Sequence, residues 1–148
     1  TACSDGDKTA GTSEESEGII AVTDWEVAGV SQKGPFVTGS AVTVQELDGI
    51  TLKQTGKSFK GKISNDRGEF SVKDISLISQ FALLETEGFY RNEVTGDVSK
   101  SQITLNALVD LSEREKANIN LLTHLEYERV IKLIEDGMDI VIGIAGIV

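Results

Sequence analysis

Two stretches about thirty residues apart decide how this chain is expected to fold. The first, over residues 34–44, reads GPFVTGSAVTV, and the second, over residues 64–70, reads SNDRGEF. In the first, a turn with the only proline of the chain leads into an alternating strand, residues 41–47. In the second, a polar turn with a glycine leads into a strand that places Phe70 in the core. Both patterns are typical of an antiparallel β-sandwich.

Alternating apolar residues continue on both sides of these two stretches. They predict further strands at 27–30, 58–64, 69–72, 77–91 and 103–109, the longest of them with a bend at Gly88. Turn signals recur about every 8–12 residues, which is the spacing expected of a sandwich of about seven strands.

From Asn120 the pattern becomes helical. An apolar stripe contains Leu122, Leu125, Val130, Leu133 and Ile134. We expect Thr123 to cap this helix, with Glu126 completing a capping box, and Gly137 to end it. Residues 138–148 are nearly all apolar, too few to span a bilayer, and are expected either to dock on the core or to promote aggregation. The sequence therefore divides into an acidic tether (1–18), a sandwich domain (19–111) and a helical, apolar segment (112–148).

The two opening stretches resemble the signature of carboxypeptidase regulatory-like domains, whose fold is a transthyretin-like sandwich. Pro35, Gly39, Ala41 and Val42 match the first motif with one extra residue in its spacing. Residues 64–70 match the second motif without gaps, with Ser64 for Thr and Asn65 for Asp. The resemblance implies a mainly β, seven-stranded antiparallel transthyretin-like or Ig-like sandwich followed by a C-terminal helix. It also implies an accessory module without catalytic residues.

The segment from Gly34 to Arg129 also resembles uncharacterised bacterial envelope lipoproteins, although residues 143–148 depart from their Lys/Ala-rich continuation and suggest an altered or truncated C-terminus. Residues 1–3, Thr-Ala-Cys, resemble the end of a bacterial lipoprotein signal, because small residues precede the cysteine and a Gly/Ser/Thr/Glu-rich stretch follows it. We expect lipid on Cys3 to hold the protein at the outer membrane of a bacterial envelope, on its periplasmic or exposed side. The alternative is an incidental cysteine in a disordered tail.

Charge and composition exclude several classes of function. A formal net charge of -10 disfavours binding to nucleic acid or anionic lipid. One cysteine and one histidine cannot form a closed zinc site or an internal disulfide. His124 lies in no nucleophile motif, although Asp110 and Ser112 lie near it in the sequence. The sequence therefore predicts a protein that is not an enzyme and has no cofactor.

The remaining polar and aromatic residues leave two kinds of binding site open. Calcium could bind carboxylates at loop ends, against the simpler interpretation of solvated turns, and the residues concerned are Asp48, Asp66, Glu69 and Asp74. Outside the clear core strands, the large aromatics are Trp25, Phe89, Tyr90 and Tyr127, which either fill the core or bind a ligand.

The strongest ligand-binding candidate is an aromatic pair beside hydrogen-bonding groups at the end of a strand: Phe89, Tyr90, Arg91 and Asn92. The sequence thus predicts a non-catalytic envelope lipoprotein with a structural, adhesion or assembly role, whose partner is an envelope protein or a polysaccharide. The alternative is a carbohydrate- or peptide-binding module of a surface degradative system.

Overall fold

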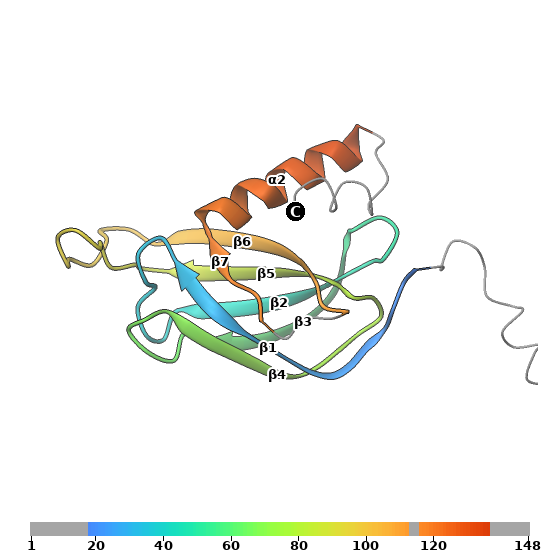
Figure 1. The fold of residues 1–148 in the computed structure, drawn as a ribbon, viewed down its shortest axis with the longest axis horizontal. Coiled ribbons are helices and arrows are strands. Elements are labelled where there is room, and N and C mark those ends of the chain that lie inside the picture. The colour runs from blue at the N-terminus through green and yellow to red at the C-terminus, as the bar shows by residue number, and fades with distance from the viewer. Residues whose placement is uncertain (1–17, 113–115, 137–148) are drawn as a thin grey trace, which may run out of the picture.

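The computed structural model describes residues 18–112 and 116–136, which form two β-sheets and one helix (Figure 1). Within these residues the elements are β1 (Val22–Gln32), β2 (Ala41–Leu47), β3 (Gln54–Lys62), β4 (Glu69–Leu77), β5 (Phe81–Gly88), β6 (Ile103–Asp110), β7 (Ile119–Asn120) and α2 (Leu121–Glu135). The mainly β class, the strand count and the C-terminal helix agree with the prediction from the sequence.

The strands are ordered β4-β1-β7 in one sheet and β3-β2-β5-β6 in the other. All pairs in the four-stranded sheet are antiparallel, and so is β1 with β4. The pair of β1 and β7 is parallel, with Ser31 beside Ile119. The prediction of a wholly antiparallel sandwich is therefore wrong for the three-stranded sheet. The segment that begins with the parallel bridge of Lys116 to Ala28 continues into β7 beside β1, so β7 runs in the same direction as β1.

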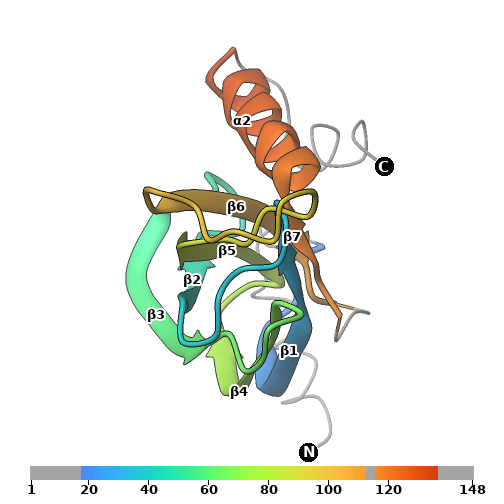
Figure 2. The ribbon, with the colours of Figure 1, turned by 90° about the vertical axis from the view of Figure 1, so that its left-hand side faces the viewer.

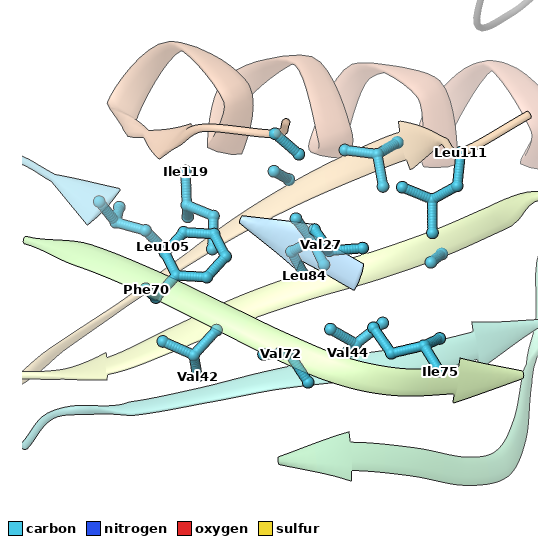
Figure 3. Packing of buried hydrophobic residues seen from close by; sticks show 14 of the residues in the cluster. Val27, Val42, Val44, Phe70, Val72, Ile75, Leu84, Leu105, Leu111 and Ile119 are labelled. Atoms are coloured by element: carbon cyan, nitrogen blue, oxygen red, sulfur yellow. The ribbon is translucent and has the colours of Figure 1, made fainter. Parts of the chain in front are cut away.

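The main core lies between the two sheets (Figure 3). Strand alternation turns every second side chain of each strand toward the other sheet. The fully or almost fully buried side chains of this core include Val27, Phe70, Val72 and Ile75 from the three-stranded sheet and Val42, Val44, Leu84, Leu105 and Ala107 from the other. The expectation that Phe70 enters the core is confirmed.

The two sheets meet at one corner, where β3 curves toward β4 (Figure 2). Ile63, just after β3, pairs with Phe70 at the start of β4. Gly61 allows this close approach, because a Cβ atom there would lie 2.9 Å from a methyl carbon of Val72. The turn between them contains Gly68 at a φ of 79°, where a Cβ would lie 2.4 Å from the carbonyl oxygen of Ser31. This glycine is therefore required both by its backbone conformation and by the neighbouring strand.

Several element boundaries differ from the sequence-based expectations. The first strand begins at Val22 and includes Trp25, and the long segment 77–91 is divided by a turn at 78–80. The short β7 falls where no strand was expected. Helix α2 is capped by Asn120, whose side chain accepts from the main-chain N–H of Thr123, so Thr123 is not the cap. Thr123 itself completes the capping box by accepting from the N–H of Asn120, because its hydroxyl can play the role expected of Glu126.

Helix α2 packs against the outside of the four-stranded sheet, beside β6 (Figures 1 and 2). A second core forms there around Leu83 and Val130, with Tyr127 and Ile134 packed against it. The predicted apolar stripe is therefore wrong in its first two turns. Leu122 and Leu125 are exposed, because the contacts of Thr123 and His124 with β6 turn a different face of the helix toward the sheet. Among the described residues, no helix is long and apolar enough to cross a membrane.

Candidate functional site

The segment from Phe89 to Asn92 extends β5 beyond the regular sheet and is held on both sides by main-chain bonds. The N–H of Val37 donates to the carbonyl of Phe89 at 3.0 Å, and the N–H of Arg91 donates to the carbonyl of Pro35 at 2.8 Å. On the other side, the N–H of Ser99 donates to the carbonyl of Tyr90 at 2.8 Å. Residues 35–37, which belong to the GPFVTGSAVTV stretch, therefore lie alongside this segment.

Tyr90 points inward, and its ring packs against the core. Its centroid lies 6.5 Å from that of Phe36, which is fully buried. The ammonium group of Lys33 lies 5.0 Å from the centroid of the Tyr90 ring and donates to its hydroxyl at 3.4 Å. Tyr90 thus joins two loops through apolar packing and a cation–π contact.

Arg91 and Asn92 shape the turn that follows. The carboxamide oxygen of Asn92 accepts from the main-chain N–H groups of Val94 and Thr95, at 2.8 and 3.1 Å. A guanidinium nitrogen of Arg91 donates to the carbonyl of Gly96 at 2.8 Å. Hydrogen-bonding groups that looked available for a ligand are therefore engaged in the loop, whose tip carries Val94 with 94% of its surface exposed.

Phe89 differs from its neighbours because strand alternation turns it away from the core. It follows Glu87 and Glu85 along the same side of β5, and 36% of its surface is exposed. Its side chain therefore borders the outward surface of the four-stranded sheet rather than the interior. Of the two aromatic residues predicted as part of a site, Phe89 therefore has the more accessible ring.

The strand register arranges the outward surface in two polar rows. In one row Lys62 pairs with Ala41, Ala41 with Glu87, and Glu87 with Thr104. In the next row the corresponding pairs join Lys60, Thr43, Glu85 and Asn106. These positions alternate with buried core residues, so their side chains point outward. We call this surface the outer face; it comprises Ala41, Thr43, Lys60, Lys62, Glu85, Glu87, Thr104 and Asn106, with Phe89 at its end.

Helix α2 borders the outer face through His124. Its Nδ1 accepts from the main-chain N–H of Asn106 at 3.2 Å, and the hydroxyl of Thr123 donates to the carbonyl of Asn106 at 3.0 Å. Because Nδ1 is an acceptor, the proton of the neutral ring lies on Nε2, which is 3.3 Å from a carboxylate oxygen of Glu128. The side-chain oxygen of Asn106 is buried and accepts no hydrogen bond from any described residue.

Tyr127 lies about one helical turn after His124 on α2. Burial raises the pKa of its hydroxyl, and the carboxylates of Glu85 and Glu128 raise it further. Tyr127 is therefore a neutral hydrogen-bonding group, able to donate and accept, between β5 and the helix.

The remaining chemical candidates are placed apart from this surface. The carboxylate of Asp110 accepts from the N–H of Ser112 within its own turn, whereas His124 contacts Asn106 and Glu128. Asp48 accepts within the β2–β3 loop, and Asp66 accepts from Thr38. Over residues 18–112 and 116–136, no three His, Cys, Asp or Glu residues come together as a group that could hold a metal ion. Cys3 lies outside the described residues.

Sequence alternation could have shown that Glu85, Glu87, Thr104 and Asn106 point outward. It could not show which of them become neighbours, because that depends on the register between strands. The contact of His124 with Asn106 gives no signal in the sequence.

Comparisons with known proteins leave the family open. No family model matches the chain, and no curated protein matches it. A solved structure from Pseudomonas aeruginosa, described as a candidate carbohydrate binding protein, matches 72% of this chain and 94% of its own with a TM-score of 0.43 and 13% sequence identity. That similarity is too low to assign a fold family or a ligand. Membership of the carboxypeptidase regulatory-like family therefore stays a prediction.

Proposed function

We propose that this protein is a non-catalytic adhesion module of the bacterial envelope that binds a polysaccharide on its outer face. The observation that carries the proposal is the pair of polar rows across four strands, bordered by Phe89 at one end and by His124 and Tyr127 on α2. Amide, carboxylate, ammonium and hydroxyl groups are the partners that sugar hydroxyls need, and an accessible ring provides a stacking surface.

Asn106 supports the same proposal from an independent direction. A buried acceptor without a partner costs roughly 1–3 kcal/mol. The side-chain oxygen of Asn106 is such an acceptor among the described residues, and it lies beside His124 at the border of the outer face. The surrounding side chains would have to move before a ligand hydroxyl could donate to this oxygen, because it is buried. Such a group calls for an explanation, and a ligand that donates to it is the one we propose.

A glycan array with the purified protein tests the proposal, followed by calorimetry with any saccharide that binds. We expect Phe89→Ala to weaken binding by about tenfold, or ~1.4 kcal/mol, without loss of fold. Val94→Ala is the matched control, because Val94 is a more exposed apolar residue of the same connection. Absence of binding to any glycan, or equal binding by Phe89→Ala and the wild type, would contradict the proposal.

Tyr90→Ala separates a binding role from a structural one. The Tyr90 ring packs against Phe36 and Lys33, so its loss is expected to lower the free energy of unfolding. Asn106→Leu is the complementary variant, because it removes the unsatisfied acceptor and retains the volume. We expect it to fold with stability close to that of the wild type and to bind saccharide more weakly.

A second candidate function is assembly, which is favoured by an exposed apolar face on the first turns of α2. Leu121, Leu122 and Leu125 are each about half exposed or more. Burial of this face against a second copy of the chain would stabilise a dimer. Sedimentation of the wild type and of the double variant Leu122→Glu with Leu125→Glu tests this role. A wild type that is monomeric at all concentrations would contradict it.

Attachment through Cys3 is part of the proposal and rests on the sequence around that residue. Metabolic labelling with a palmitate analogue in a bacterium tests it, with the chain expressed behind a lipoprotein leader. We expect labelled wild type and unlabelled Cys3→Ser. Equal labelling of the two proteins would show that Cys3 is not the lipid acceptor.

A further inference from the structure

Three isoleucine side chains are exposed on loops at one end of the two sheets. Ile20, Ile50 and Ile78 have 52%, 51% and 57% of their surface exposed. Ile20 precedes β1, Ile50 lies in the β2–β3 loop, and Ile78 lies in the turn between β4 and β5. These three segments lie together at the right-hand end of Figure 1, opposite the loop between β5 and β6. Single exposed apolar residues are ordinary, whereas three that converge from distant parts of the chain call for an explanation.

Contacts between the three segments hold this end together. The carboxamide of Gln80 accepts from the main-chain N–H of Ile20 at 2.8 Å and donates to the carbonyl of Gly18 at 2.8 Å. A Cβ at Gly49 would lie 2.9 Å from side-chain carbons of Ile19, so the β2–β3 loop packs against the same stretch. Residues 18–20 are therefore attached both to the β4–β5 turn and to the β2–β3 loop.

The main-chain N–H of each exposed isoleucine already has an acceptor. That of Ile20 donates to Gln80, that of Ile50 donates to a carboxylate oxygen of Asp48 at 2.8 Å, and that of Ile78 donates to Glu46 at 3.0 Å. Transfer of a main-chain N–H into an apolar medium is costly unless the group is hydrogen-bonded. The three loops therefore present apolar side chains whose own N–H groups need no water.

The same three segments contain no charge. Residues 18–23, 49–52 and 75–84 include no Asp, Glu, Lys or Arg, in a chain of which 26% is charged. Asp48 and Lys53, which flank the middle segment, have opposite charges. A neutral, apolar surface can approach a bilayer without the repulsion that an acidic surface meets at anionic lipid.

The first described residues enter the domain at this end. Gln80 holds Gly18 here, and residues 4–17 separate Gly18 from Cys3. In any conformation, a segment of that length spans at most about 50 Å. Lipid on Cys3, which belongs to the proposed function and on which this inference rests, would therefore keep the three isoleucines close to a bilayer. Attachment raises the local concentration, so that even a weak contact is populated.

We propose that Ile20, Ile50 and Ile78 form a membrane-contacting surface, which inserts into the boundary between headgroups and acyl chains of the bilayer that holds Cys3. Apolar burial at this boundary adds a second contact to a lipid anchor. The contact would also orient the domain. Phe89 follows the opposite end of β5 from Gln80, so the polysaccharide-binding surface that it borders would extend away from the bilayer.

Tryptophan fluorescence of the full chain tests the proposal, with Cys3 coupled to a maleimide lipid in phosphatidylcholine vesicles. Cys3 is the only cysteine, so the coupling is specific. Ile50→Trp introduces a reporter at the surface, and Val94→Trp is the matched control in the exposed loop at the opposite end. We expect brominated acyl chains to quench the fluorescence added by Ile50→Trp but not that added by Val94→Trp. Equal quenching in both variants, or quenching in neither, would overturn the proposal.

Charged substitutions complete the test in the Ile50→Trp protein. Ile20→Glu with Ile78→Glu should abolish the quenching, whereas Val94→Glu with Val98→Glu adds the same charge at exposed positions of the opposite loop and should leave it unchanged. Equal effects of the two pairs would overturn the proposal. So would oligomers of the uncoupled wild type in sedimentation that Ile20→Glu with Ile78→Glu cannot form, because they would assign the surface to a second copy of the chain.

The chemical coupling keeps this test separate from the proposed function. Equal palmitate labelling of wild type and Cys3→Ser would remove the natural anchor, but it would leave a quenching difference between Ile50→Trp and Val94→Trp in place. Specific labelling of Cys3 without that difference would instead overturn the membrane-contacting surface and leave the anchor intact.

Discussion

The imidazole Nδ1 of His124 accepts a hydrogen bond of 3.2 Å from the main-chain N–H of Asn106, so a side chain of α2 completes the outer edge of β6. The hydroxyl of Thr123 donates to the carbonyl of the same residue. An edge strand with unpaired main-chain groups invites association with other chains. The beginning of α2 therefore covers part of the β6 edge, whereas β3, at the opposite edge, has β2 as its lateral neighbour in this sheet among the described residues.

Replacement of His124 is expected to weaken the attachment of α2. In His124→Ala the N–H of Asn106 loses its acceptor next to the helix, which should lower the free energy of unfolding by about 1–3 kcal/mol. Urea denaturation followed by circular dichroism measures the change. Arg129→Ala, an exposed substitution on the same helix, is the control and should change stability by less than about 0.5 kcal/mol. Similar losses in both variants would contradict a specific role of the imidazole.

Asp48 predicts a pH dependence of stability. Hydrogen bonds from the main-chain N–H of Thr51 and then of Ile50 hold the pKa of its carboxyl below the ordinary value of 3.8. A carboxyl with a lowered pKa stabilises the fold fully above its unfolded pKa, and this contribution is lost as the pH falls through the folded-state pKa. Asp48→Asn keeps the acceptor and removes the charge. We expect it to be less stable than the wild type at pH 7.

The measurement for this prediction is urea denaturation of both proteins at a series of pH values. The difference in stability between wild type and Asp48→Asn should shrink as the pH falls below the ordinary range of aspartate, because the wild type then becomes neutral as well. A difference that stays constant down to acid pH would show that the charge of Asp48 contributes nothing.

Two glycines on facing loops provide a graded test of close packing. A Cβ at Gly34, where φ is 33°, would lie 1.8 Å from the carbonyl oxygen of Arg91, whereas a Cβ at Gly96, where φ is 78°, would meet nothing within 4 Å. Gly96→Ala should therefore cost only the left-handed backbone strain, about 1–2 kcal/mol. Gly34→Ala adds a collision with main chain and should cost about 3 kcal/mol or more. Thermal unfolding of both variants measures the order, and equal losses would contradict it.

Phe36 and Phe89 allow the effect of burial on stability to be compared. Phe36 is fully buried against Tyr90, and Phe89 is partly exposed. Phe36→Ala is expected to lower the free energy of unfolding by about 3–5 kcal/mol. Phe89→Ala should lower it by less than about 1 kcal/mol. Chemical denaturation of both variants checks the difference. A larger loss for Phe89→Ala would mean that its ring supports the fold instead of a ligand.

The sequence predicts well those parts of the fold that depend on local alternation and turn chemistry. Residues 41–47 alternate and form β2 with the same bounds, and the turn at Asn65–Gly68 leads Phe70 into the core as expected. These features depend on neighbours in the chain, so the sequence contains the information directly.

Features that depend on distant partners could not be predicted in this way. Strand β7 has two residues, which are too few for a periodic signal, and it is a strand only through its parallel pairing with β1. The prediction of which face of α2 is buried was wrong, because hydrogen bonds from α2 to Asn106 set the rotation of the helix. Hydrophobicity alone predicts that Leu122 and Leu125 are buried, but both are exposed. At the candidate site, the hydrogen bonds of Arg91 and Asn92 within their own loop became visible only with its backbone.

The parallel contact between β1 and residues 117–120 also constrains the order of folding. The N–H of Ala117 donates to the carbonyl of Ala28 at 2.9 Å, and the side chain of Asn118 accepts from the N–H of Val30, across a separation of 88 residues. Contacts of such high sequence separation form late, because the loop between them must close first. During synthesis, the first strand therefore has one side uncovered until residues 116–120 have emerged. A chaperone that recognises exposed strands would find it during that interval.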